Sequence, residues 1–159
     1  HIVKHIGEKE NERFLEPRYT SIDPEHFEPV IEGMHMVFEE GTARGSRIDS
    51  IPMCGKTGTA ENPHGQDHSI FIAFAPRKDP KIAISIIVEN GYWGSRWAAP
   101  ISSLMMEYYI SGKISRPRLL ERMEEGDLRE EYRLQEEERQ RRRQEALEKA
   151  RQEREKAAA

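Results

Sequence analysis

Apolar residues recur at helical spacing between residues 23 and 41. They are Phe27, Val30, Ile31, Met34, Val37 and Phe38, which would form one apolar stripe on a helix. Asp23 and Pro24 predict the start of this helix, because aspartate accepts hydrogen bonds from free N–H groups and proline suits the first helical position. Gly41 predicts its end. Pro29 lies inside the stretch and removes one backbone donor, so we expect it to bend the helix.

Three extended segments follow this helix. Ile51–Ala60 is predicted as a strand, although its glycines weaken the pattern. Ser69–Ala75 is apolar on both faces, which is typical of a central strand, and Lys81–Glu89 is predicted as a second buried strand. A short proline-bounded turn joins the last two segments, so they are predicted to pair as an antiparallel hairpin.

A second amphipathic helix is predicted after the strands. Its apolar positions are Trp97, Ile101, Leu104, Met105 and Tyr108, and it is expected to end near Gly112. Residues 1–6 resemble the end of a strand, and residues 7–16 a turn or an exposed hairpin. The order of elements favours an α+β fold in which helices cover an antiparallel sheet. So few strands indicate a part of a larger fold.

The composition changes at residue 117. Of the 43 residues in 117–159, 25 are charged, so this segment cannot bury a core of its own. We therefore divide the chain into a globular section, residues 1–116, and a charged helical tail, residues 117–159. Acid-first pairs four residues apart support one long helix over Arg118–Lys156; they are Glu137/Arg141, Glu138/Arg142 and Glu145/Lys149. Leucines are too sparse for a coiled coil. The tail is either a surface appendage or a docking arm for a partner.

Composition also narrows the function classes. No run of about 18 apolar residues exists, so the chain contains no candidate membrane span. Cys54 is the only cysteine, which excludes an intrachain disulfide and a multi-cysteine zinc site. The net charge is −4, and the basic cluster of residues 139–143 lacks interleaved aromatic residues, so nucleic-acid binding is not expected. The chain begins with His1 and without a leader pattern, which suggests a fragment or a processed chain.

The chemically informative segment is Gly55–Ala60, with the sequence GKTGTA. Gly-Lys-Thr also occurs in phosphate-binding P-loops, but those need a glycine where this chain has Ser50, and a helix directly afterwards. The residues that follow, ENPHG, are not helical. A P-loop is therefore a poor interpretation.

Lys-Thr-Gly on a strand is also a motif of serine acyl-transfer sites. A Lys56 ammonium beside a serine nucleophile would raise the local positive potential and take part in proton relay. The hydroxyls of Thr57 and Thr59 would bind a substrate carboxylate, and Gly58, without a Cβ, would let a peptide lie along the strand. The backbone N–H of Thr59 would donate to a developing oxyanion. The plainer alternative is a glycine-containing strand with an exposed lysine.

Longer segments around this motif carry a family resemblance. They read DPEHFEPVIEGMHMVFEEGTA, GKTGTAENPHGQDHSIFIAFAP, KIAISIIVENG and WAAPISSLMMEYY. Over about residues 1–112 the chain resembles the C-terminal part of the transpeptidase domain of class B penicillin-binding proteins, of the penicillin-binding protein 2 type. The resemblance implies that Lys56 is catalytic, that Thr57, Gly58 and Thr59 bind substrate, and that the Thr59 N–H forms half of an oxyanion hole.

Two further motifs of that family are absent from the chain. No serine is followed by lysine three positions later, and none by asparagine two positions later. In such enzymes both motifs precede Lys-Thr-Gly, so we expect them upstream of His1. Acyl transfer needs an activated nucleophile. The chain alone is therefore expected to be inactive.

The resemblance implies a D,D-transpeptidase that cross-links peptidoglycan stem peptides through a serine acyl-enzyme. It also implies inhibition by β-lactam antibiotics, partners from the cell-elongation machinery, and a location at the periplasmic face of the bacterial inner membrane. It implies no metal and no organic cofactor. Two alternatives stay open: a catalytically inactive peptide-binding module, and a β-lactamase-like serine hydrolase.

Other side chains have competing interpretations. His64, Asp67 and His68 have ligand-like chemistry without a recognised metal spacing, and Asp67 or His68 is better explained as an anchor for the next strand. Cys54 is interpreted as a small packing residue rather than a replacement nucleophile. Three aromatic residues cluster around a glycine-rich turn: Tyr92, Trp93 and Trp97. Either they line the rim of a groove, or Trp97 packs in its helix and the other two are simply exposed.

Overall fold

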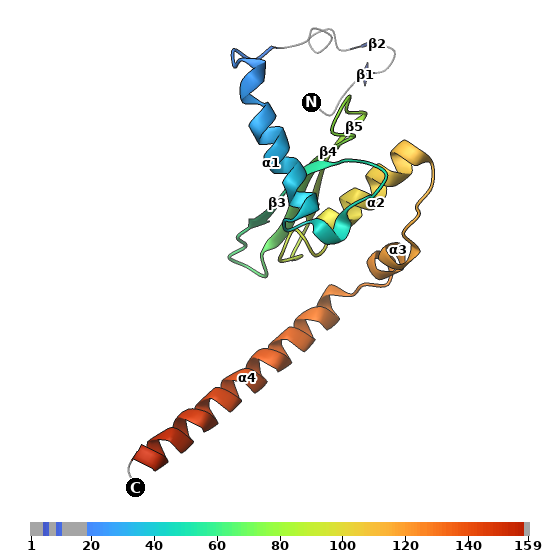
Figure 1. The fold of residues 1–159 in the computed structure, drawn as a ribbon. Coiled ribbons are helices and arrows are strands. Elements are labelled where there is room, and N and C mark those ends of the chain that lie inside the picture. The colour runs from blue at the N-terminus through green and yellow to red at the C-terminus, as the bar shows by residue number, and fades with distance from the viewer. Residues whose placement is uncertain (1–4, 7–8, 11–18, 158–159) are drawn as a thin grey trace.

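The computed structural model describes residues 5–6, 9–10 and 19–157. The elements in chain order are β1 (His5–Ile6), β2 (Lys9–Glu10), the 3₁₀ helix η2 (Pro24–His26), α1 (Glu28–Glu39), the 3₁₀ helix η3 (Arg44–Ser46), β3 (Cys54–Ala60), β4 (His68–Ala75), β5 (Ile82–Val88), α2 (Ala98–Ser111), α3 (Pro117–Glu124) and α4 (Leu128–Ala157). The architecture is α+β, as predicted, and α4 extends well away from the other elements (Figure 1). None of the described helices is long and apolar enough to cross a bilayer.

The sheet that carries the motif has three antiparallel strands in the order β3-β4-β5. The central position of β4 agrees with its apolar residues on both faces. β1 and β2 form a separate two-stranded antiparallel pair within the predicted 1–16 region, and the remaining residues of that region lie outside the described ones.

Alternation along β4 divides the sheet into a covered and an open face. Phe71, Ala73 and Ala75 are buried in one hydrophobic cluster with residues of α2, which packs on β4 and β5. On the other face, Ile72 is 47% exposed and Ile87 of β5 is 63% exposed. The period of two therefore points alternate side chains into the core.

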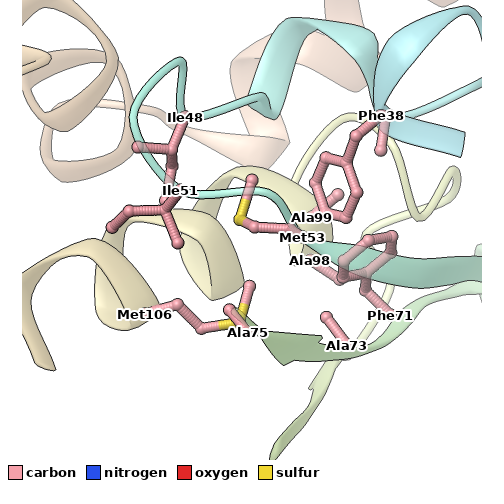
Figure 2. Close-up of a cluster of buried hydrophobic side chains, with 11 residues drawn as sticks. Phe38, Ile48, Ile51, Met53, Phe71, Ala73, Ala75, Ala98, Ala99 and Met106 are labelled. Atoms are coloured by element: carbon pink, nitrogen blue, oxygen red, sulfur yellow. The ribbon is translucent and has the colours of Figure 1, made fainter. Parts of the chain in front are cut away.

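The core lies between the sheet and α2, and α1 contributes to it (Figure 2). Its buried members are Phe38, Ala43, Ile48, Ile51, Met53, Phe71, Ala73, Ala75, Ala98, Ala99 and Met106. The rings of Phe38 and Phe71 meet edge to face, with centroids 5.7 Å apart and an interplanar angle of 87°. This geometry favours the interaction between aromatic quadrupoles, and it joins α1 to the central strand.

The start of α1 differs from the prediction in two ways. Asp23 makes no side-chain capping bond, and Pro24–His26 form a separate 3₁₀ turn before α1 begins at Glu28. Pro29 therefore lies in the first turn of α1 rather than inside the helix. Backbone N–H groups in a first turn have no helical partner, so Pro29 removes no hydrogen bond there and the expected bend is wrong.

The end of α2 follows the prediction. Gly112 adopts φ = 71°, the left-handed region that glycine enters without strain. Its N–H donates to the Tyr108 carbonyl at 2.8 Å, which satisfies one of the last free carbonyls of the helix.

A buried ion pair joins α2 to the segment that follows it. The Glu107 carboxylate, 3% exposed, accepts from the Arg116 Nε at 3.0 Å and from the Ser115 N–H at 3.0 Å. Arg116 Nη1 also donates to the Ser46 carbonyl of η3 at 3.0 Å. Burial alone would raise the pKa of Glu107, but the hydrogen bonds from Ser115 and Arg116 outweigh it and hold this pKa below its ordinary value.

The tail is two helices, not the one continuous helix predicted over Arg118–Lys156. The break lies at Gly126, where a Cβ would come within 2.3 Å of the Trp97 ring. Asp127 then starts α4, because its carboxylate accepts from the Arg129 N–H at 2.8 Å. Close packing on Trp97 therefore selects glycine at this position, and glycine interrupts the helix.

Charge pairs along α4 agree with the prediction in part. Glu138 and Arg142 pair at 2.6 Å, four residues apart. Glu137 instead accepts from Arg133 at 3.0 Å, while Arg141 lies 3.9 Å from Glu145. An arginine on a helix can reach a carboxylate one turn away in either direction, so sequence spacing alone does not decide which pair forms.

Candidate active-site cleft on the Lys-Thr-Gly strand

A cleft of about 570 Å³ runs along β3. Its lining comes from three separate segments of the chain: Thr42; Lys56, Thr57, Gly58 and Thr59; and Trp93, Gly94 and Ser95. In the described sheet, β3 pairs only with β4, so its other edge is unpaired. An unpaired strand edge beside a cleft can accept an extended peptide as an additional strand.

Lys56 projects from the middle of β3 and is exposed. Its Nζ donates to the Thr57 carbonyl at 2.7 Å. Within the described part of the chain Lys56 forms no ion pair with a carboxylate. Its positive charge is therefore not neutralised locally and is available to an anionic group in the cleft.

The two threonines of the motif have different surroundings. The Thr57 Oγ1 lies 3.0 Å from the Thr42 Oγ1, within hydrogen-bond distance, whereas Thr59 is exposed. Thr42 belongs to the segment between α1 and η3 and was not singled out from the sequence. No local pattern marks it, because only the tertiary fold brings it to β3.

The glycines around the cleft differ in how much room surrounds their Cβ positions. A Cβ at Gly55 would lie 2.6 Å from the Phe71 ring, and a Cβ at Gly94 would lie 2.3 Å from the Ile70 carbonyl oxygen. Packing therefore excludes a side chain at both positions. A Cβ at Gly58 would meet only Ile70, at 3.4 Å, which is an ordinary contact. The protein's own packing leaves room for a side chain at Gly58.

The segment that carries Trp93 and Gly94 is held by a buried serine. Ser69, on β4, is fully buried; its Oγ donates to the Trp93 carbonyl at 2.9 Å and accepts from the Ala98 N–H at 3.2 Å. One hydroxyl therefore fixes both ends of this segment against the sheet. Sequence reasoning did not identify Ser69 or Gly94, because both act through tertiary contacts.

The aromatic cluster separates into two roles. Trp97 is buried, with 6% of its surface exposed. Trp93 is 55% exposed and lines the cleft. The Tyr92 and Trp93 rings lie 5.1 Å apart. The two interpretations of the sequence therefore each hold for a different tryptophan.

Asp67 and His68 hold the loops at the start of β4. The Asp67 carboxylate accepts from the Asn62 N–H at 3.3 Å, and the His68 Nδ1 accepts from the Asn90 N–H at 3.0 Å. His64 contributes its own N–H to the Asn62 side chain at 3.0 Å. Among the described residues, no three histidine, cysteine or acidic side chains gather as a metal site.

Cys54 and His35 attach α1 to β3. Cys54 is fully buried and its thiol donates to the Ile31 carbonyl at 3.6 Å. Burial raises the pKa of this thiol, so the nucleophilic thiolate is disfavoured. The His35 Nδ1 lies 2.9 Å from the Met53 carbonyl oxygen. Cys54 therefore serves packing, as the sequence suggested, and His35 adds a polar contact between α1 and the residue that precedes β3.

Comparison with known proteins identifies this arrangement. The family model described as penicillin binding protein transpeptidase domain matches residues 1–107. The peptidoglycan D,D-transpeptidase MrdA of Acinetobacter baumannii is 33% identical over 101 aligned residues, and the match covers 54% of this chain and 15% of that protein. The peptidoglycan D,D-transpeptidase PbpA of Mycobacterium tuberculosis is 39% identical over 77 aligned residues, and the match covers 42% of this chain and 15% of that protein.

A solved structure agrees with this match. The crystal structure of Pseudomonas aeruginosa PBP2 in complex with WCK 5153 superposes with a TM-score of 0.54 and 35% identity, covering 60% of this chain and 21% of that one. The chain spans about 15% of the length of the curated relatives named above. A match over residues 1–107, together with this fold, means that the chain belongs to the penicillin-binding protein transpeptidase family.

Proposed function

We propose that this chain forms one wall of the substrate site of a peptidoglycan D,D-transpeptidase. The observation that carries the proposal is the unpaired edge of β3 beside a 570 Å³ cleft, with Lys56, Thr57 and Thr59 on its surface. Residues 1–116 supply this wall, and residues 117–159 are an appendage. The full activity belongs to a longer protein, of the kind that the relatives represent.

In this proposal a stem peptide lies along β3 and bonds its main chain to the unpaired edge. The protein's own packing would tolerate a side chain at Gly58. Glycine is required there because a side chain would block the peptide that approaches the strand. The Thr57 and Thr59 hydroxyls hold the terminal carboxylate, and Thr42 orients Thr57 through their 3.0 Å contact.

The chemistry would proceed through a serine outside these 159 residues. Its Oγ forms a bond to the peptide carbonyl carbon, the C–N bond to the last residue breaks, and the departing amine takes the proton that the serine gave up. The amine of a second peptide then attacks the same carbonyl carbon, the C–O bond to the serine breaks, and the proton that the amine gives up returns to the serine oxygen, which completes the cross-link. Lys56 stabilises the negative charge, and the Thr59 N–H donates to the oxyanion.

The same site would react with β-lactams, which acylate the serine in place of the peptide. The family to which the chain belongs is named for penicillin binding, which supports this acylation step. A location at the periplasmic face of the inner membrane, and partners from the cell-elongation machinery, belong to the same proposal.

The test measures acylation of the complete protein by a fluorescent penicillin. We expect Lys56→Ala to slow labelling by about 10²-fold or more, the scale seen when a preorganised electrostatic contact is lost. Lys78→Ala is the matched control, because Lys78 is an exposed lysine in the β4–β5 turn, outside the cleft lining.

Three other outcomes would contradict the proposal. Labelling of Lys56→Ala at the wild-type rate removes the role given to Lys56. Rapid labelling followed by rapid release of the hydrolysed product favours the β-lactamase-like hydrolase. Peptide binding without any labelling of the wild-type protein favours the inactive binding module.

A further inference from the structure

The long helix α4 is bonded to the rest of the chain near its start. Glu131 accepts from the Arg96 Nε at 2.9 Å and from the Trp97 Nε1 at 3.2 Å. Beyond this joint the helix runs away from the other elements (Figure 1). Leu147 lies about 28 Å along the axis from Leu128, at about 1.5 Å per residue. Its side chain is 63% exposed, so the distal part of α4 presents an apolar group to solvent.

The face of α4 around Leu147 carries positive charge and no acidic residue. Residues three or four positions apart share a helix face, and the residues at these distances from Leu147 are Arg143, Gln144, Ala150 and Arg151. Arg143 has no acidic residue three or four positions away, and it forms no ion pair among the described residues. This Leu147 face therefore combines an exposed leucine with a guanidinium whose charge is not neutralised.

An apolar groove of about 300 Å³ lies between α2 and α3. Leu104, Met105 and Tyr108 line it from α2, and Leu120 and Met123 line it from α3. Met105 is 51% exposed and Tyr108 is 61% exposed, so much of this apolar surface is open to solvent. Contiguous apolar surface that is left open often marks an interaction site.

Glu124 is the one charged residue that lines this α2–α3 groove. It has no lysine or arginine three or four positions away in the sequence, and it forms no ion pair in the part of the chain that the structure describes. The groove thus offers an apolar space beside an unneutralised carboxylate. These features complement the leucine and the guanidinium of the Leu147 face in both polarity and charge.

The chain's own tail does not reach the groove. α3 ends at Glu124 and α4 begins at Leu128, so α4 starts close to the groove and then carries Leu147 away from it (Figure 1). Folding back would require a sharp bend in α4, and its sequence contains no proline or glycine at which a helix usually bends. A second copy of the protein presents the same face without any change in α4.

We propose that the α2–α3 groove binds the Leu147 face of a second copy of this protein. Leu147 enters the apolar space, and Arg143, one helical turn away, pairs with the Glu124 carboxylate. Two copies related by a twofold axis exchange their tails, so both contacts form together and the assembly closes as a dimer. The inference does not rest on the proposed function, because the groove and the Lys-Thr-Gly cleft share no lining residue.

The test measures the mass of the complete protein by analytical ultracentrifugation over a range of concentrations. We expect a dimer with a dissociation constant in the micromolar range. Leu147→Ala should raise this constant by about tenfold or more, because the dimer loses the buried leucine of both tails. Leu134→Ala is the matched control and should leave the constant unchanged. Leu134 is an exposed leucine of the same helix that does not share the Leu147 face.

Charge reversal tests directly whether the contact joins two copies. Glu124→Arg places a second guanidinium opposite Arg143, and Arg143→Glu places two carboxylates together, so each variant alone should dimerise at least about tenfold more weakly than the wild type. An equimolar mixture of the two variants should regain nearly the wild-type affinity, because every groove then meets a tail of opposite charge. Arg141→Glu changes the net charge equally but lies away from the Leu147 face, so it should dimerise like the wild type.

Three results would overturn the proposal. A complete protein that stays monomeric up to about 100 μM has no such contact between copies. A dimer that Leu147→Ala does not weaken is held by another surface. Failure of the mixture to restore dimerisation means that Glu124 and Arg143 do not meet, whereas recovery also shows that both variants are folded, since a misfolded chain could not regain a partner.

Discussion

Gly94 lies directly on the backbone of Gly58, and a Cβ at Gly94 would approach the Gly58 carbonyl oxygen to 2.8 Å. This contact sets how close the segment with Trp93 comes to the Lys-Thr-Gly strand. The depth of the cleft therefore depends on a glycine outside the motif as well as on the motif itself.

Gly94→Ala should push this segment away from β3. Its methyl group would meet the Ile70 and Gly58 carbonyls, which are backbone atoms that cannot move aside cheaply. We expect a loss of about 1–3 kcal/mol in the free energy of unfolding, the usual cost of overpacking. Urea unfolding measures it. Gly45→Ala is the control, because nothing lies within 4 Å of its Cβ position; equal stability of the two variants would contradict the packing argument.

Glu107→Gln should destabilise the chain at neutral pH and progressively less in acid. The variant leaves the Arg116 guanidinium, 20% exposed, without its carboxylate, at a cost of about 3 kcal/mol. The pKa of Glu107 is lowered in the folded state, so its contribution is complete above its ordinary value of 4.5 and is lost as the pH falls through the lower, folded value.

Unfolding at about pH 7 and at about pH 3 measures this dependence. The difference between wild type and Glu107→Gln should narrow at the lower pH. Glu121→Gln, at an exposed position of α3, is the control and should change little at either pH. A difference in the free energy of unfolding that is the same at both pH values would show that the charge of Glu107 is not the cause.

Asp127→Ala should shorten α4 at its start. The carboxylate that accepts from the Arg129 N–H is lost, which costs about 1 kcal/mol for an N-cap residue. Amide hydrogen exchange at residues 128–131 reports the fraying. Asp127→Asn keeps an acceptor and should restore most of the protection; failure of asparagine to do so would mean that the cap is not the reason.

Thr42→Val should slow penicillin acylation of the complete protein without preventing folding. The variant removes the partner of the Thr57 hydroxyl, and a neutral hydrogen bond contributes about 0.5–1.5 kcal/mol, or up to about tenfold in rate. Thr42→Ser keeps the hydroxyl and should react at nearly the wild-type rate. Equal rates for Val and Ser would exclude a role of Thr42 in orienting Thr57.

Local patterns were enough to predict the sheet and the helix that covers it. The strands around Phe71 and Ile84 follow from their apolar runs, although β5 is exposed on one face rather than buried. Gly112 marks the helix end because a left-handed residue there requires glycine. Sequence failed at the start of α1, because Pro29 is equally compatible with a bend and with a first turn, and only tertiary structure decides where the helix begins.

The site also contains residues that the sequence could predict and residues that only the folded structure reveals. Residues 56–59 could be proposed from their motif, since the chemistry is carried by adjacent residues on one strand. Thr42, Ser69 and Gly94 could not, because they lie far apart in sequence and meet β3 only in the folded chain. Glycine and aspartate at 126–127 are typical of a helix break and a helix start, but the regular charge pattern on either side favoured one continuous helix.

The length of α4 has a mechanical consequence. Its 30 residues form a rod of about 45 Å at 1.5 Å per residue. The rod is fastened near one end, where Glu131 bonds to Arg96 and Trp97. A sideways force on its far end therefore acts as torque at that joint, which lies two residues from Gly94 in the wall of the cleft.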